Sequence, residues 1–142
     1  MIVYADSSFL VSSYTGDAHS TEADNRRTLL PSILITQFVR AEVCTALHQQ
    51  VFQRRVTLAQ ANSAWQDFEQ DCNNGSLMRI DFPIAALHRT VDLAKLFAPT
   101  LGVRTLDSLH VACALELKAE RFWTFDERQA RLAEAVGLDT SA

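Results

Sequence analysis

The chain has 142 residues, of which 48% are hydrophobic, and a formal net charge of −4. This length and composition predict one domain spanning residues 1–142 with a sizeable buried core. The acidic balance creates no overall positive field, which disfavours a protein that binds nucleic acid only through Lys and Arg. It does not disfavour an enzyme whose metal ions supply the positive charge at the site.

The three cysteines, Cys44, Cys72 and Cys113, are unevenly spaced and form no CxxC pair. Free thiols in a reducing compartment are the expected state of such cysteines. The amino terminus has no basic region typical of a signal peptide, and Asp6 interrupts its apolar start. No apolar stretch is long enough to span a membrane. We therefore expect a cytoplasmic protein with no membrane partner.

The first half of the chain alternates short apolar runs with amphipathic segments. The pattern predicts strands at 2–5 and around 34–35, and helices at 8–14, 20–30 and 37–54. Thr57-x-x-Gln60 is a capping box, which starts the next helix and ends the turn before it. The helices on either side of this turn are expected to form an antiparallel hairpin that projects from the sheet.

The second half continues the alternation. It predicts strands at 76–80 and 121–125, and helices from Pro83 to about 98, over 105–119, and from Asp126 to about 136. A short final strand near Leu138 is a further possibility. Strands separated by helices imply a parallel sheet covered on both faces. The fold class is therefore α/β, with three α/β/α layers around a central parallel sheet of four to five strands.

Two acids directly follow predicted strands. Asp6 follows the first strand, and Asp126 follows the strand at 121–125. Open parallel sheets bind ligands beyond the carboxyl ends of their strands, so both side chains are expected at that edge. Helix capping is the alternative explanation for each of these residues.

Two further acids lie on helices. Glu42 falls within an apolar arc that includes Val39 and Val43, where an unpaired carboxylate costs several kcal/mol unless an Arg from elsewhere or a metal ion binds it. Asp107 lies in the first turn of a buried helix that Thr105 would cap, and the helix dipole alone would favour an acid there. Carboxylates that converge at a sheet edge suit Mg²⁺, or alternatively Mn²⁺.

Five other residues are candidates to support such a site: Ser7, Ser8, Arg104, His110 and Thr124. The two serines would orient a carboxylate, or else serve as turn and cap residues. Alternation along the strand puts Thr124 on the same side as the acid two residues later. His110 would contact a phosphate or be a structural histidine, and Arg104 would contact a phosphate or pair with an acid.

Taken together, four segments resemble PIN-domain ribonucleases of the VapC toxin type: Asp-Ser-Ser after the first strand, VRAEV, RTLDSLHVACAL and TFDERQARLAEAVGL. The resemblance runs from Met1 to Leu138. It implies a PIN-like fold, a site that binds Mg²⁺ or Mn²⁺ through the four acids, and hydrolysis of RNA. It also implies the toxin of a type II toxin–antitoxin pair, a homodimer silenced by a cognate antitoxin. The four acids concerned are Asp6, Glu42, Asp107 and Asp126.

Other functions remain open at this point. A PIN nuclease for RNA maturation or DNA flaps and a catalytically silent interaction module both fit the pattern. A receiver-type signalling domain needs a lysine at the sheet edge late in the chain, whereas Lys95 and Lys118 lie in predicted helices. The sequence does not distinguish the RNA target, the number of ions or the general base.

Overall fold

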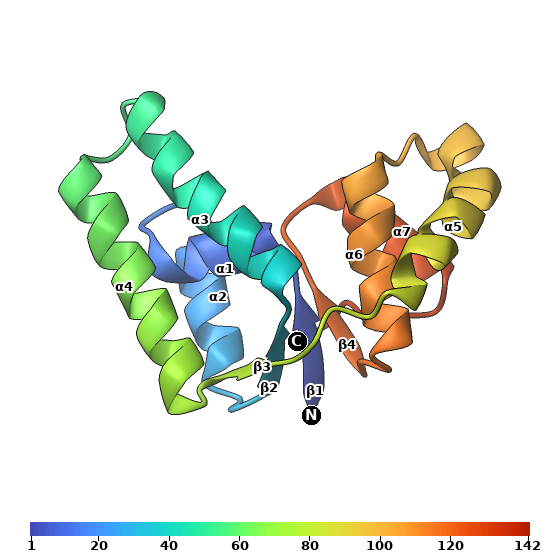
Figure 1. Cartoon of the computed structure of the whole chain (residues 1–142), viewed down its shortest axis with the longest axis horizontal. Helices are drawn as coiled ribbons and strands as arrows, with labels where there is room; N and C mark the ends of the chain where they lie inside the picture. The colour runs from blue at the N-terminus through green and yellow to red at the C-terminus, as the bar shows by residue number, and fades with distance from the viewer.

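Residues 1–142 are all described by a computed structural model, which contains four strands and seven helices (Figure 1). The strands are β1 (Ile2–Ala5), β2 (Ser32–Ile35), β3 (Leu77–Arg79) and β4 (Arg121–Trp123). The helices are α1 (Ser7–Tyr14), α2 (Ser20–Arg27), α3 (Gln37–Phe52), α4 (Leu58–Asn74), α5 (Ala85–Leu101), α6 (Thr105–Glu116) and α7 (Glu127–Ala135).

The four strands form one parallel sheet in the order β3-β2-β1-β4. Tyr4 in β1 pairs with Leu34 on one side and with Phe122 on the other. Strands β2 and β3 thus lie on one side of β1 and β4 lies on the other, so the strand order reverses between β1 and β4. The additional strand expected near Leu138 is absent, because only one bridge, between Arg121 and Asp139, forms there.

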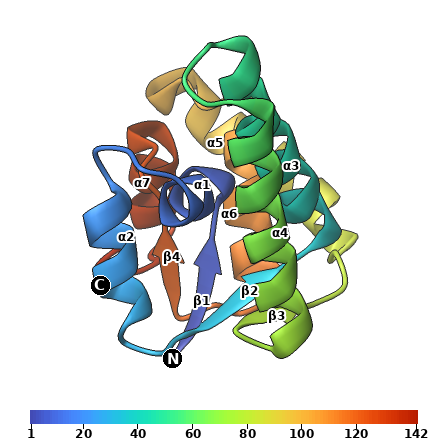
Figure 2. The same cartoon turned by 90° about the vertical axis from the view of Figure 1, so that its left-hand side faces the viewer.

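Helices cover both faces of the sheet, which confirms the three-layer α/β/α architecture. Figure 1 shows α1 to α4 on one side of the sheet and α5 to α7 on the other, and Figure 2 views the first of these layers from outside. Helices α3 and α4 form the expected antiparallel hairpin, whose tip extends beyond the sheet. At its turn the capping box of Thr57 and Gln60 is present.

The core is one contiguous cluster of buried residues that reaches both faces of the sheet. Aromatic side chains fill it: Phe9 packs against Trp123, and Tyr4 stacks on Phe122. Phe68 and Trp123 are fully buried, and Trp65 stacks on Phe68 at the edge of the cluster. Burial on both faces explains why β1 and β2 are nearly continuous apolar runs.

Several element boundaries differ from those expected. Pro83 precedes α5, which begins at Ala85. Thr105 is the first residue of α6 and makes no cap, because Asp107 reaches back to the Arg104 backbone N–H instead. The three cysteines form no disulfide. No helix combines the length and the apolar character needed to cross a membrane.

Candidate metal site at the carboxyl edge of the sheet

Asp6 lies at the carboxyl end of β1 and is fully buried. Its Oδ1 accepts hydrogen bonds from the Phe9 backbone N–H (3.0 Å) and the Ser8 hydroxyl (2.7 Å). Its Oδ2 accepts one from the Thr124 hydroxyl (2.8 Å). Burial raises the pKa of Asp6, and His110 together with these hydrogen bonds only partly offsets that effect. The Asp6 carboxylate thus caps a helix, and few positively charged groups offset its negative charge.

Thr124 links Asp6 to Asp126. Its hydroxyl donates to Asp6 and accepts from the Asp126 backbone N–H (2.9 Å). Asp126 Oδ1 in turn accepts from the Gln129 backbone N–H (3.0 Å) and caps α7. Thr124 therefore connects the Asp6 carboxylate to the backbone of Asp126, and Ser8 also binds the Asp6 carboxylate. Ser7, by contrast, makes no side-chain hydrogen bond within the chain.

Glu42 reaches the same region from α3, on the first face of the sheet. Its carboxylate is hydrogen-bonded to His110 Nε2, and His110 Nδ1 lies 2.8 Å from the Tyr4 hydroxyl. The partner of Glu42 within the chain is thus a histidine of α6, and the arginine considered as one alternative is not there. Burial and the nearby thiol of Cys113 and carboxylates of Asp6 and Glu42 raise the pKa of Tyr4, so its hydroxyl stays protonated.

Asp107 is buried in the first turn of α6, one turn before His110. Its Oδ2 accepts from the Arg104 backbone N–H (2.9 Å). The Arg104 side chain is exposed and forms no ion pair with any carboxylate. Next to Asp107, the Ser108 hydroxyl is buried without a hydrogen-bond partner.

The chemistry of these donors fits a hard divalent cation. No Arg or Lys pairs with Asp6, Glu42, Asp107 or Asp126. One oxygen each of Glu42, Asp107 and Asp126 makes no hydrogen bond within the protein. Even so, no three His, Cys, Asp or Glu side chains already form a group that could hold a metal ion. Convergence of all four acids on one ion therefore stays a prediction.

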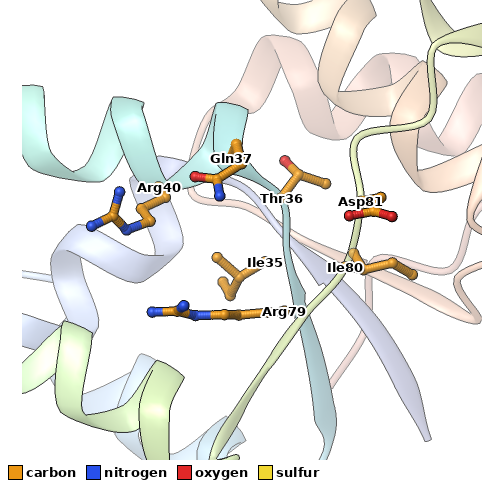
Figure 3. Close-up of a pocket in the computed structure, with 7 residues that line it drawn as sticks. All are labelled: Ile35, Thr36, Gln37, Arg40, Arg79, Ile80 and Asp81. Carbon is orange, nitrogen blue, oxygen red and sulfur yellow. The ribbon is translucent and has the colours of Figure 1, made fainter.

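A pocket of about 440 Å³ lies farther along the same edge, beyond β2 and β3 (Figure 3). Arg40 and Arg79 line it, together with Gln37 and Asp81. Both arginines pair with the single carboxylate of Glu69, which compensates only part of their combined charge.

Sequence reasoning missed Tyr4, Arg79 and Gln37. Tyr4 lies two residues before Asp6, so alternation along β1 was a signal that both side chains lie on one side of the strand. No comparable signal exists for Arg79 or Gln37, whose place at the pocket depends on how β3 and α3 meet.

Comparison with known proteins agrees with this architecture. The family model described as PIN domain matches residues 3–135. No curated protein sequence matches the chain significantly. Among solved structures, VapC20 of Mycobacterium tuberculosis, described as a sarcin-ricin loop cleaving toxin, is similar, with a TM-score of 0.72, 16% identity, and 98% of each chain covered.

Two other structures are similar over most of their length. VapBC2 of Rickettsia felis, bound to a DNA fragment from its promoter, gives a TM-score of 0.68 at 19% identity and covers 99% of this chain and 98% of its own. PAE2754 of Pyrobaculum aerophilum gives a TM-score of 0.66 at 15% identity and covers 96% of this chain and 86% of its own. At these identities the structural matches establish the fold.

The fold defines a class of protein: an α/β/α domain with acidic residues at the sheet edge between β1 and β4. Because the family model covers almost the whole chain, this protein belongs to the PIN-domain family. The resemblance read from the four sequence segments is thereby confirmed, and the fold is the one found in VapC toxins.

Proposed function

We propose that this protein is a metal-dependent endoribonuclease and the toxin of a type II toxin–antitoxin pair. One observation supports the proposal most strongly. Asp6 is fully buried, has no Arg or Lys partner, and is linked through Thr124 to the backbone of Asp126, where the strand order of a PIN domain reverses. A buried carboxylate of this kind is tolerated when a cation binds it in the working state.

In this proposal Asp6, Glu42, Asp107 and Asp126 hold Mg²⁺ or Mn²⁺. The bound ion supplies an activated water and stabilises the departing oxygen of the phosphodiester. Ser8 and Thr124 keep Asp6 turned toward the edge of the sheet through their hydrogen bonds. Arg104, exposed and free of ion pairs, is available to contact an RNA phosphate.

The proposed partners follow from the comparisons and from the surface. VapC20 is described as cleaving the sarcin-ricin loop, and VapBC2 as binding promoter DNA; by analogy we propose an RNA substrate and a cognate antitoxin here. Ile84, Leu87 and Val91 expose an apolar stripe along α5, which suits a homodimer interface. The free thiols agree with a location in the cytoplasm.

The proposal is tested with purified protein and structured RNA. We expect cleavage in Mg²⁺ or Mn²⁺, loss of cleavage in EDTA, and recovery when Mn²⁺ is added in excess. Asp6→Asn should lower the rate roughly 100-fold or more, because a metal ligand contributes several kcal/mol to the transition state.

Asp92→Asn is the matched control, since Asp92 is exposed on α5 and makes no hydrogen bond or ion pair. Its rate should stay within about a factor of two of the unsubstituted protein. Cleavage that survives both EDTA and Asp6→Asn would contradict the metal site. Absence of any cleavage by the unsubstituted protein would favour the interaction module instead.

A further inference from the structure

Glu42 belongs to a chain of hydrogen bonds that crosses three elements of the fold. Its carboxylate on α3 contacts His110 on α6, and His110 contacts Tyr4 on β1. We propose that His110 is a positioning residue that orients Glu42 for ion binding, and that Tyr4 determines which imidazole nitrogen faces Glu42. This role rests on the metal-dependent function proposed above.

The position of the protons follows from the partners. The Glu42 carboxylate can only accept a hydrogen bond, so the imidazole proton lies on Nε2, facing Glu42. Nδ1 then accepts from the Tyr4 hydroxyl. One oxygen of Glu42 accepts from His110, and the other remains free for an ion.

His110 is itself held rigidly. It is 1% exposed, so its orientation depends on its neighbours in the core. Its ring lies 4.7 Å from that of Phe38 and 5.8 Å from that of Tyr4, centroid to centroid. A hydrogen bond from a fixed imidazole restricts a glutamate that is otherwise free to change rotamer, and this restriction has an entropy cost. This cost is then met on folding, before an ion binds.

Both ring nitrogens of a buried histidine need hydrogen-bond partners, and the identity of those partners is informative here. The only side-chain hydrogen-bond partners of His110 are Tyr4 and Glu42, so the pair of bonds connects the sheet to one acid of the proposed site. Hydrogen bonds from a second residue to a metal-binding carboxylate typically change metal affinity or activity by roughly 10- to 100-fold. The role of His110 is therefore measurable apart from folding.

Four variants separate positioning from packing. His110→Leu removes both hydrogen bonds, whereas His110→Gln keeps a donor near the position of Nε2. Tyr4→Phe removes only the hydroxyl that fixes the imidazole. Val111→Ala is the packing control, because Val111 is fully buried in α6 but does not contact Glu42 through a hydrogen bond. Mn²⁺ affinity is measured by titration calorimetry on each folded variant, and RNA cleavage gives kcat and KM.

We expect His110→Leu to weaken Mn²⁺ binding roughly 10- to 100-fold. His110→Gln should recover most of this loss, and Tyr4→Phe should show a smaller loss than His110→Leu. Val111→Ala should lower thermal stability while leaving Mn²⁺ affinity unchanged. In each affected variant kcat should fall more than KM rises, because the ion acts in the chemical step.

A spectroscopic measurement tests the same arrangement without metal or RNA. In ¹⁵N spectra of the metal-free protein at pH 8, the His110 proton should lie on Nε2. A proton on Nδ1, unchanged Mn²⁺ binding in His110→Leu, or equal losses in the Leu and Gln variants would overturn the role of His110. If the unsubstituted protein neither binds Mn²⁺ nor cuts RNA, the proposed function itself fails, which is a different outcome.

Discussion

At the end of β1, Asp6 carries a carboxylate that is fully buried and has no Arg or Lys beside it. Three hydrogen bonds compensate part of the lost hydration, yet burial still raises the pKa of Asp6. Near neutral pH the ionised side chain therefore opposes folding. A bound cation would turn this cost into binding free energy, which links the function of Asp6 to protein stability.

We predict that Asp6→Asn leaves the metal-free protein at least as stable as the unsubstituted one. The amide oxygen can still accept from Phe9 and Ser8, while the uncompensated charge is gone. Added Mn²⁺ at about 100 times its Kd should stabilise the unsubstituted protein by about 2.7 kcal/mol, which raises Tm by several degrees, but should not stabilise Asp6→Asn. Thermal unfolding followed by circular dichroism measures both effects.

Asp92→Asn should respond to Mn²⁺ as the unsubstituted protein does. An equal rise in Tm for the Asp6→Asn variant would show that the ion binds elsewhere. A large loss of stability in metal-free Asp6→Asn would show that the carboxylate is needed for capping rather than for a cation.

Sequence reasoning placed some site residues by local rules alone. Asp6 and Asp126 could be located because each follows a strand, and Thr124 because side chains alternate along a strand. The contact between Glu42 and His110 could not be predicted, since 68 positions separate them and only the packing of α3 and α6 across the sheet brings them together. The helical wheel indicated that Glu42 needs a partner but not which one.

Helices α1, α2 and α4 are joined by one polar cluster away from the site. Asp71 of α4 accepts hydrogen bonds from Tyr14 of α1 (2.5 Å) and from Arg27 of α2 (2.9 Å). Partial burial would raise the pKa of Asp71, but these two hydrogen bonds outweigh it and hold the pKa below its usual value. The ionised form of Asp71 thus stabilises the packing of this layer.

This cluster predicts a specific loss of stability in acid. Because the pKa of Asp71 is lower in the folded state, its contribution is complete above about pH 4 and is lost as the pH falls further. Asp71→Asn should cost about 1 kcal/mol at pH 7 and much less at pH 3. Urea unfolding at both pH values measures the difference.

Glu127→Gln is the control, since Glu127 pairs with Arg131 only at the surface. It should change stability little at either pH. The same loss for Asp71→Asn at pH 3 and pH 7 would contradict an ionised Asp71 as the source of the stabilisation.

Elements with local signals were predicted well, and those that end through tertiary contacts were not. The box of Thr57 and Gln60 starts α4, and Gly75 ends it with a φ of 85°, which glycine adopts without strain. The strand expected at 121–125 instead ends at Trp123. Its next two residues leave the sheet because Thr124 and the Phe125 backbone bond to Asp6 and Ser8.

Over the whole molecule, the net charge of −4 makes the proposed ion the main source of positive potential at the site. The sequence predicted a parallel sheet with two covered faces but not the strand order. That order depends on which strands pair across long connections, and the hydrophobic pattern of each strand is compatible with several neighbours. The order β3-β2-β1-β4 is what brings the residues after β1 and β4 together.

A crystal soaked in Mn²⁺ tests the central claim most directly, through anomalous scattering from the ion. We predict a strong anomalous peak at the edge between β1 and β4, within ligand distance of Asp6 and of at least two of the other acids: Glu42, Asp107 and Asp126. Oxygen ligands alone should surround it. No peak at this edge, or a peak bound only by residues elsewhere, would contradict the account.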